Sequence, residues 1–253
     1  MTDGGGAARL EIRGLRKRFG GVTAIDDVSL DLRGGIVTAL VGPNGAGKTT
    51  LFNLITGHLH PDGGDIHWNG GSIVGKAVWK IARMGIARSF QDLRLFSQMT
   101  VAENVLTVME PRAWLWQAGG SAARRKRRVA LASILEATRL ADKARVRAID
   151  LAYAERKFLS LARIMATDAR LWLLDEPASG LDPRSHELFF SLLRREVRKG
   201  VTVCIIEHNL QIVVGISDRI VFLDRGRLLA EGEPREIMRD PQLAAIYFGE
   251  GRA

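Results

Sequence analysis

Short apolar runs recur along the chain, and polar or turn-forming residues bound each of them. Three such runs, of four to six residues, lie at Ile36–Val41, Leu171–Leu174 and Val201–Ile206. Runs of this length without alternation are typical of strands buried on both faces. Helical periodicity follows the second and the third run, so the pattern predicts an α/β core.

A different pattern precedes and interrupts this core. Between Leu10 and Asp31 polar and apolar residues alternate in the manner of antiparallel strands, with Phe19-Gly20-Gly21 as the turn. From Val101 to Ala166 helical periodicity dominates. Smaller features are short strands at Asp65–Trp68 and Gly85–Phe90, breaks at Pro111 and Gly119-Gly120, and a hairpin around Asp224–Gly226.

These patterns predict one domain over residues 9–253, which consists of the α/β core, an N-terminal antiparallel β-subdomain and an inserted α-helical subdomain at about residues 92–167. Residues 1–8 are glycine-rich, and we expect them to be disordered. A chain of 253 residues can bury a sizeable core without crosslinks.

Cysteine content and hydropathy indicate the cellular compartment and whether the chain crosses a membrane. The single cysteine, Cys204, lies inside an apolar run, which favours a buried packing thiol and a reducing compartment. No apolar run is long enough to span a bilayer, and the N-terminus lacks the apolar core of a signal peptide.

The formal net charge of +9 permits nucleic acid, anionic lipid or an acidic protein surface as a partner. Much of this charge lies in Arg124–Arg128, shortly after Trp114 and Trp116. One interpretation is an amphipathic segment that touches a membrane surface. The other, which we favour, is a surface loop with two packed indoles and a solvated helix face.

The segment Gly42–Thr49 completes the pattern G-x-x-x-x-G-K-[ST] between a buried strand and a helical segment. Glycines let backbone N–H groups turn toward phosphate oxygens, and the helix N-terminus adds the positive end of its dipole. Lys48 would reach the β- and γ-phosphates, and Thr49 would offer its hydroxyl to Mg²⁺. The pattern predicts a nucleoside triphosphate site made of Gly42, Pro43, Asn44, Gly45, Ala46, Gly47, Lys48, Thr49 and Thr50.

Two adjacent acids, Asp175 and Glu176, end the apolar run that starts at Leu171. A strand places successive side chains on opposite faces, so we expect the two acids to have different roles. Asp175 would hold Mg²⁺, usually through water, and Glu176 would polarise the attacking water.

With these motifs in order, nearly the whole chain resembles the nucleotide-binding subunits of ABC transporters. The resemblance implies the ABC ATPase fold, ATP and Mg²⁺ as ligands, and ATP hydrolysis. It also implies further site residues. Phe19 would stack on adenine, Gln91 would contact Mg²⁺ and the attacking water, and His208 would contact the γ-phosphate. Ser179–Asp182 resembles the D-loop, which crosses the dimer interface and would bring Asp182 to the nucleotide.

Three segments resemble the branched-chain amino-acid importer ATPases of the LivG type, namely Arg88–Val105, Ile206–Leu210 and Gly226–Glu250. Urea and amide importer ATPases share much of this pattern. The resemblance implies integral-membrane permease subunits, a second ATPase subunit and, indirectly, a periplasmic or extracellular solute-binding protein. It implies no specific nucleic-acid partner. It also implies that the protein is peripheral, on the cytoplasmic face of the inner membrane.

The signature motif departs from the family pattern L-S-G-G-Q, because the aligned residues are Leu151, Ala152, Tyr153, Ala154 and Glu155. Ala152 lacks the hydroxyl that would donate to a γ-phosphate. Ala154 would be strained in the positive φ that glycine tolerates. Glu155 suits a helix N-terminus but adds a negative charge. Either the motif acts through backbone N–H groups and the helix dipole, or the chain supplies the weaker signature to a different ATPase subunit, which we favour.

Two other functions stay open. A soluble ABC-type ATPase that acts on nucleic acid or ribosomes agrees with the net charge. Such proteins, however, usually carry two cassettes or a long coiled coil, and this sequence has one phosphate loop and no sustained heptads. A regulatory subunit that binds ATP without hydrolysis agrees poorly with the presence of Glu176 and His208.

Overall fold

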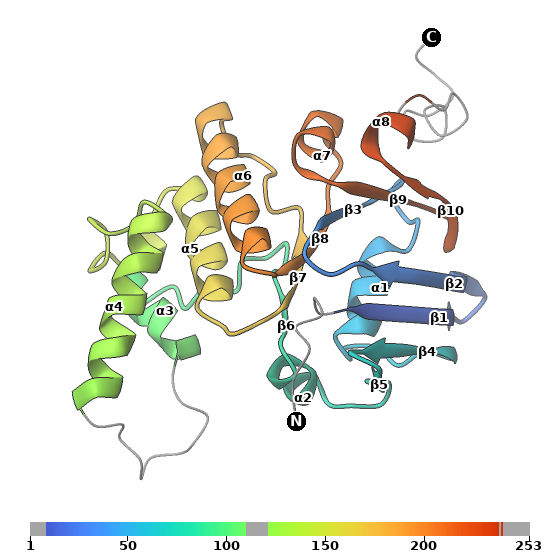
Figure 1. Cartoon of the computed structure of the whole chain (residues 1–253), viewed down its shortest axis with the longest axis horizontal. Helices are drawn as coiled ribbons and strands as arrows, with labels where there is room; N and C mark the ends of the chain where they lie inside the picture. The colour runs from blue at the N-terminus through green and yellow to red at the C-terminus, as the bar shows by residue number, and fades with distance from the viewer. Residues whose placement is uncertain (1–8, 110–120, 238, 240–253) are drawn as a thin grey trace.

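The computed structural model describes residues 9–109, 121–237 and 239, which form two sheets and the helices around them (Figure 1). The six-stranded sheet has the order β10-β9-β3-β8-β7-β6. Strands β9, β3, β8, β7 and β6 are parallel, and β10 is antiparallel to β9. Their bounds are β3 Val37–Val41, β6 Ile86–Arg88, β7 Leu171–Asp175, β8 Thr202–Ile206, β9 Arg219–Asp224 and β10 Arg227–Gly232.

The middle strands of this sheet are buried on both faces, which explains their unbroken apolar sequences. Alternate side chains enter two different cores. Trp172 and Leu174 of β7 point into one core, whereas Leu171 and Leu173 point into the other. The same division holds in β8, where Cys204 lies in the second core. Complete burial raises the pKa of the Cys204 thiol to about 12, so it is an unreactive packing group, as predicted.

Four strands form the antiparallel sheet, in the order β2-β1-β4-β5. The predicted turn at Phe19-Gly20-Gly21 is confirmed, because β1 ends at Phe19 and β2 begins at Val22. Side chains such as Leu10, Ile12 and Ile25 face the core that contains Cys204. The bounds are β1 Leu10–Phe19, β2 Val22–Leu32, β4 Gly63–Trp68 and β5 Gly71–Ser72.

The helices divide between the two faces of the six-stranded sheet. Helix α1 contributes Leu51 and Phe52 to the core that it shares with the antiparallel sheet. Helices α3 to α7 contribute to the opposite core, with α3 and α4 outside α5 (Figure 1). The bounds are α1 Lys48–Ile55, α2 Val78–Arg83, α3 Val101–Met109, α4 Ser121–Ala137, α5 Tyr153–Met165, α6 Pro183–Arg198, α7 Leu210–Ile216 and α8 Pro234–Ile237, with a 3₁₀ turn at Ala148–Asp150.

Helices α3, α4 and α5 lie where the helical subdomain at about residues 92–167 is expected, and its boundaries stay a prediction. Residues 1–8, the segment with Pro111, Trp114, Trp116 and Gly119-Gly120, and the end of the tail lie outside the described residues. The basic run Arg124–Arg128 lies on α4 and is largely exposed, in agreement with a solvated helix face. Among the described helices, none combines the length and hydropathy that crossing a bilayer requires.

Candidate functional site

The carboxyl ends of four neighbouring strands meet at one edge of the parallel sheet. Leu40 of β3 and Asp175 of β7 both pair with Ile206 of β8, so these three strands end at the same level. Strand β6 pairs with β7 and ends at Arg88, which is opposite Leu173. Every segment that leaves this edge therefore starts beside the others, and such edges are where ligands bind in open α/β sheets.

The phosphate loop after β3 depends on its glycines for two reasons. Gly42 and Gly47 have φ values of +146° and +104°, which other residues rarely adopt. The backbone also passes close to both positions: a Cβ on Gly42 would lie 1.9 Å from the carbonyl oxygen of Leu223. One on Gly47 would lie 2.4 Å from that of Ala24. The sequence therefore fixes the loop against both sheets with its backbone N–H groups unobstructed by side chains.

Lys48 is the first residue of α1 and is 6% exposed. Its Nζ donates to the carbonyl oxygens of Gly42 at 2.7 Å and Pro43 at 2.8 Å, so the ammonium lies inside the curve of the loop. Burial lowers the pKa of Lys48, and the nearby carboxylates of Glu176 and Asp175 oppose this. No side chain caps the N-terminus of α1, where Thr49 and Thr50 follow. These features suit a multiply charged anion.

Asp175 is the last residue of β7, and its side chain is 7% exposed. Its N–H donates to Ser89 Oγ at 2.9 Å, and its Oδ2 lies 3.5 Å from Arg88 Nη2. Burial raises the pKa of Asp175, whereas the Arg88 guanidinium acts in the opposite direction. Two effects on the ionised carboxylate therefore oppose each other: burial disfavours the negative charge, and the buried Arg88 guanidinium favours it.

Glu176 corrects the prediction that strand alternation separates the two acids. The strand ends at Asp175, and Glu176 has a φ of +46°, in the left-handed region. Its N–H still donates to the Ile206 carbonyl at 2.9 Å, and its own carbonyl accepts from Lys157 Nζ at 2.6 Å. A backbone turn that β8 and α5 hold in place thus directs the Glu176 side chain, at the energetic cost that such a conformation carries.

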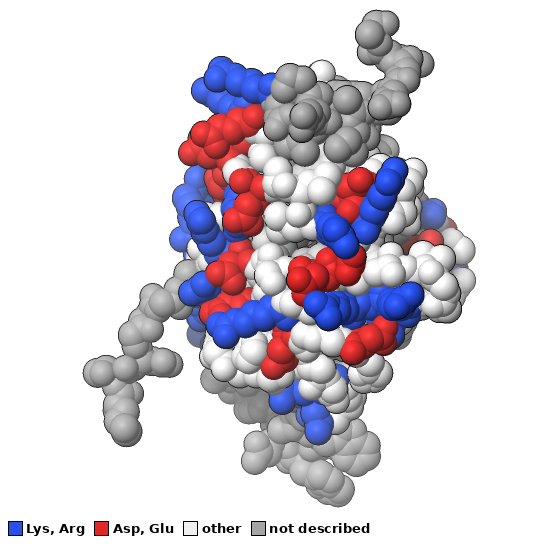
Figure 2. Space-filling view, turned by 90° about the vertical axis from the view of Figure 1, so that its right-hand side faces the viewer, with Lys and Arg blue, Asp and Glu red and all other residues white. Residues whose placement is uncertain are grey.

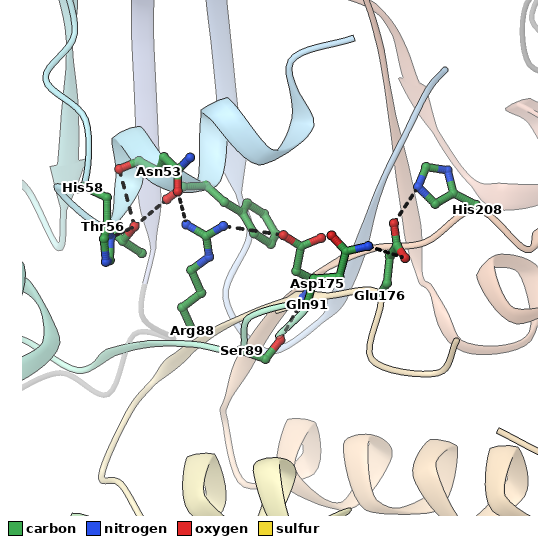
Figure 3. A network of polar contacts seen from close by, with 10 residues as sticks. Asn53, Thr56, His58, Arg88, Ser89, Gln91, Asp175, Glu176 and His208 are labelled. Carbon is green, nitrogen blue, oxygen red and sulfur yellow. Dashed lines mark hydrogen bonds and ion pairs between the residues drawn. The ribbon is translucent and has the colours of Figure 1, made fainter. Parts of the chain in front are cut away.

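Two other predicted site residues, His208 and Gln91, contact the Glu176 carboxylate (Figure 3). Glu176 Oε1 lies 2.9 Å from His208 Nε2, and Gln91 Nε2 donates to Glu176 Oε2 at 3.5 Å. The three residues come from the segments after β7, β8 and β6. Their side chains are partly open to solvent. A carboxylate held between an imidazole and an amide can orient and polarise a water molecule.

The donor set at this edge fits Mg²⁺ held jointly with phosphate. Asp175, Thr49 and Gln91 offer carboxylate, hydroxyl and amide oxygens, which are the ligands that this cation prefers. Among the described residues, no group of three or more His, Cys, Asp or Glu side chains could hold a metal by itself. Mg²⁺ is commonly bound by one or two protein groups plus substrate phosphates, so the incomplete set is the expected one.

Phe19 and Asp182, two further predicted nucleotide-binding residues, have different surroundings. Phe19 ends β1 with 45% of its surface exposed and Lys17 Nζ 5.5 Å from its ring centre, so one face can receive a base. Asp182 accepts hydrogen bonds from the N–H groups of Arg184 and Ser185 at 3.0 and 3.1 Å, and it thereby caps α6. Its hydrogen bonds to the Ser185 side chain and backbone lower the pKa of Asp182.

The altered signature forms the N-terminus of α5. Ala152 is the N-cap residue, and its N–H donates to Glu155 Oε2 at 2.9 Å. Lys143 forms an ion pair with the other carboxylate oxygen of Glu155. Burial would raise the pKa of Glu155, yet these two partners bring it below its usual value. The predicted strain at Ala154 is wrong, because this residue lies within α5 with a helical backbone.

Helix α5 and the phosphate loop lie on opposite faces of the sheet. Leu159 and Ala162 of α5 pack into one core, and Leu51 and Phe52 of α1 pack into the other. Figure 1 shows the same separation, with the sheet between α5 and α1. Lys157 of α5 reaches the Glu176 carbonyl, but in the described part of the chain no hydrogen bond or ion pair joins residues 152–155 to Lys48 or Glu176.

No role was predicted for three buried charged residues that support the site, namely Arg88, Lys157 and Glu207. Glu207 is 2% exposed and accepts the N–H of Ala178 at 2.9 Å, which ties the segment after β7 to the end of β8. Burial raises the pKa of Glu207. A charged residue inside an apolar context was the available signal, but its partners are distant in sequence.

A groove runs beside the site, between α2 and β6 on one side and α5 on the other. The charged side chains in its lining are Arg88, Arg94 and Arg163, and none of the described residues that line it is acidic. Phe90 lies in its wall, with the Arg94 guanidinium 3.7 Å and the Arg88 guanidinium 5.0 Å from its ring centre. The groove suits an apolar segment that also carries a carboxylate.

Comparison with known proteins gives consistent results. A family profile described as "ABC transporter" matches residues 25–179. The chain is 41% identical to the high-affinity branched-chain amino acid transport ATP-binding protein LivG of Salmonella typhimurium, over 95% of this chain and 98% of that protein. It is 40% identical to BraF of Pseudomonas aeruginosa, a protein of the same description, with the same coverage. The crystal structure of the ADP conformation of MJ1267, an ATP-binding cassette of an ABC transporter, superimposes with a TM-score of 0.83 at 30% identity and covers 96% of this chain and 99% of that one.

Glu207 gives a prediction about pH and stability. Because burial raises its folded-state pKa, the folded protein holds the proton more tightly than the unfolded chain, and the stability contribution of Glu207 falls as pH rises. Glu207→Gln keeps an oxygen for the Ala178 N–H without the charge. Thermal unfolding should show the variant more stable than the parent at pH 8 and equal to it near pH 4.

Glu207→Ala is the matched control, because it leaves the Ala178 N–H without its acceptor and should destabilise the protein at both pH values. A Glu207→Gln variant that is less stable than the parent at pH 8 would contradict the assignment.

Proposed function

Because the chain belongs to the ABC transporter family as an ATP-binding subunit, we propose that it powers an importer of branched-chain amino acids or related small polar solutes. The observation that carries the solute class is the identity of about 40% with LivG and BraF over nearly the full length of both proteins. The observation that carries the chemistry is the convergence of the phosphate loop, Asp175, Glu176, Gln91 and His208 at one sheet edge.

In this proposal each residue has a separate task. The phosphate-loop N–H groups and Lys48 bind the β- and γ-phosphates, and Phe19 stacks on adenine. Bound Mg²⁺ would neutralise phosphate charge, and Asp175, Thr49 and Gln91 are the residues that would hold it. Glu176 orients the attacking water and accepts its proton, and His208 contacts the γ-phosphate from the other side.

A second ATPase subunit completes the site. The N-terminus of α5 carries the family's signature and lies across the sheet from the chain's own phosphate loop. In a head-to-tail dimer, each subunit would present its α5 to the nucleotide on its partner. ATP favours the closed dimer because it then contacts both subunits, and hydrolysis removes that preference. The D-loop with Asp182 would lie at this interface.

The structure of the signature adds support to the explanation that the motif acts through backbone N–H groups and the helix dipole. Lys143 compensates the charge of Glu155, and Ala154 is unstrained, so the backbone and dipole of α5 stay available to a phosphate. What the motif lacks is the hydroxyl at position 152. We still favour a pairing with a different ATPase subunit, in which this chain supplies the weaker signature and receives the stronger one.

The membrane-embedded permease subunits would dock at the basic groove. An apolar segment with one carboxylate fits a wall that contains Phe90, Arg94 and Arg163 and, among the residues that the structure describes, no acidic side chain. Docking there would place the chain on the cytoplasmic face of the inner membrane. A solute-binding protein on the other side would act on the permease and so only indirectly on this subunit.

The face that carries the antiparallel sheet gives little support to a nucleic-acid function (Figure 2). On the side that Figure 2 shows, basic and acidic side chains are interspersed. Four ion pairs of the antiparallel sheet and its neighbours have this mixed character: Arg9–Asp31, Arg16–Asp27, Lys17–Asp62 and Arg227–Asp26. A nucleic-acid surface instead needs a continuous basic patch.

Solute uptake tests the proposal. In cells that encode this chain, its deletion should abolish uptake of labelled leucine, isoleucine and valine and spare uptake of an unrelated sugar. Loss of urea or acetamide uptake with normal leucine uptake would instead assign a urea or amide importer. Recovery of the tagged chain with nucleic acid or ribosomes, and without permease subunits, would overturn the transport function.

Glu176→Gln should keep ATP binding and lower ATP turnover by about 100-fold or more, because the amide cannot accept the proton of the attacking water. The variant should also accumulate as an ATP-bound closed dimer. Phosphate release by the purified transporter and size-exclusion chromatography measure the two effects.

The control is Glu187→Gln, which removes an exposed carboxylate from α6 and should leave turnover unchanged. Turnover of the Glu176→Gln variant within about twofold of the parent would refute the role of Glu176.

Ala152→Ser tests the asymmetric pairing. A serine hydroxyl at this N-cap can accept the N–H of Glu155 and donate to a phosphate, so the assembled transporter should hydrolyse ATP about threefold faster or more. Ala166→Ser, at the other end of α5, is the control and should have no effect. Unchanged turnover in Ala152→Ser would contradict the idea that this signature is the weaker one.

A further inference from the structure

Arg88 is a buried cation that no step of the proposed hydrolysis uses. It is the last residue of β6, and its side chain is 6% exposed. Its Nη1 donates to Asn53 Oδ1 at 2.5 Å, and its Nη2 lies 3.5 Å from Asp175 Oδ2 (Figure 3). Its Nε is buried without a hydrogen-bond partner among the described residues. The guanidinium therefore bridges α1 and the end of β7.

Two aromatic rings hold this guanidinium in place. Its carbon lies 5.7 Å from the ring centre of Phe52, which belongs to α1, and 5.0 Å from that of Phe90. Both distances are within the range of cation–π attraction. Asn53 has no other side-chain hydrogen bond in the described part of the chain than the one to Arg88. Asn53, Phe52 and Phe90 thus fix the position of the guanidinium independently of its contact with Asp175.

A role limited to fold stability explains this arrangement poorly. Replacing a buried ion pair by apolar groups is often neutral or stabilising, because burying two charges costs more than their attraction returns. The pair here is also far from its optimum, with a single contact at 3.5 Å and one donor unused. The main role of this arginine is therefore to position the Asp175 carboxylate, and its contribution to the stability of the fold is secondary.

Arg88 connects the groove to the Asp175 carboxylate, because it lines the first and contacts the second. Arg88 and Ser89 both line the groove and both contact Asp175: the Arg88 guanidinium lies beside the Asp175 carboxylate, and Ser89 Oγ accepts the backbone N–H of Asp175. The proposed permease segment would therefore touch the residues that hold Asp175. Arg163 lines the same groove, and it donates to the Arg94 carbonyl at 2.7 Å and stacks on Phe96.

We propose that Arg88 is a positioning residue, which holds one oxygen of Asp175 from the groove side and leaves the other directed at the metal and phosphates. The inference rests on the proposed function, because it takes Asp175 as a ligand of Mg²⁺. Arg88 itself contacts neither nucleotide nor metal. It acts through Asp175, and Asn53, Phe52 and Phe90 determine how firmly it does so.

The test is the gain in affinity that Mg²⁺ gives to a non-hydrolysable ATP analogue bound to the full-length chain. Affinities are measured by calorimetry with Mg²⁺ and again with a chelator, and their ratio is the readout. Arg88→Met should reduce this ratio about tenfold, the effect of one hydrogen bond to a charged group, while the affinity without Mg²⁺ stays within about twofold.

Three further variants separate positioning from general damage. Arg88→Lys keeps the charge but cannot reach Asn53 and Asp175 together, so it should restore part of the ratio. Asn53→Ala leaves Arg88 in place without its anchor and should give an intermediate reduction. Arg163→Met removes a comparable arginine from the same groove without touching Asp175, and it should leave the ratio unchanged.

An unchanged ratio in both Arg88→Met and Asn53→Ala would overturn the proposal, and so would an equal reduction in Arg163→Met. If Arg88→Met does not fold, Asn53→Ala decides, because it only shortens an amide that has one partner. If the unmodified chain shows no gain from Mg²⁺, the metal site of the proposed function fails, and that outcome differs from every result in which only the variants change.

Discussion

The register of the parallel strands β3, β8, β7 and β6 is the constraint on which the rest of the structure depends. Leu40, Ile206 and Asp175 lie at the same level, so the next residues of each strand leave the sheet side by side. The phosphate loop, Glu176 and the pair Glu207-His208 follow directly. A shift of one strand by one residue would turn its side chains to the opposite face and exchange the two cores. The site geometry and the hydrophobic cores are therefore specified together.

The same sheet separates the phosphate loop from the N-terminus of α5. Because its central strands are buried on both faces, one face takes α1 and the antiparallel sheet, and the other takes the helices α3 to α7. The phosphate loop belongs to the first group and the signature to the second. A single chain thus has a surface that binds phosphates and a different surface that would close over a partner's nucleotide. In the proposed head-to-tail dimer, the nucleotide would therefore lie between two subunits.

Local sequence patterns predicted the parts of this structure that depend on nearby residues. The unbroken apolar runs, the turn at Phe19-Gly20-Gly21, the phosphate loop and the burial of Cys204 are of this kind. Other features depend on contacts between distant segments. Glu176 has a positive φ because β8 and α5 hold its backbone, and Glu155 is compensated by Lys143 from outside its helix.

At Ala154 the family pattern predicted backbone strain, but the residue lies in a helix and is not strained. Arg88 and Glu207 were visible in the sequence only as charges near apolar runs. Their partners, Asp175 and Ala178, come from a different strand and the loop that follows it, and no spacing rule connects them. Buried charges at the ends of strands are thus where sequence patterns say least and where the structure adds most to the account of the site.

Hydrogen exchange of the chain, at a dilution at which it sediments as a monomer, tests the central claim most directly. The claim is that one subunit binds the nucleotide only at the sheet edge. Addition of Mg²⁺ and a non-hydrolysable ATP analogue should protect amides in residues 42–50 and leave those of residues 151–156 unchanged. Protection of residues 151–156 in the monomer would show that α5 reaches the chain's own nucleotide, and it would contradict the separation of the two half-sites by the sheet.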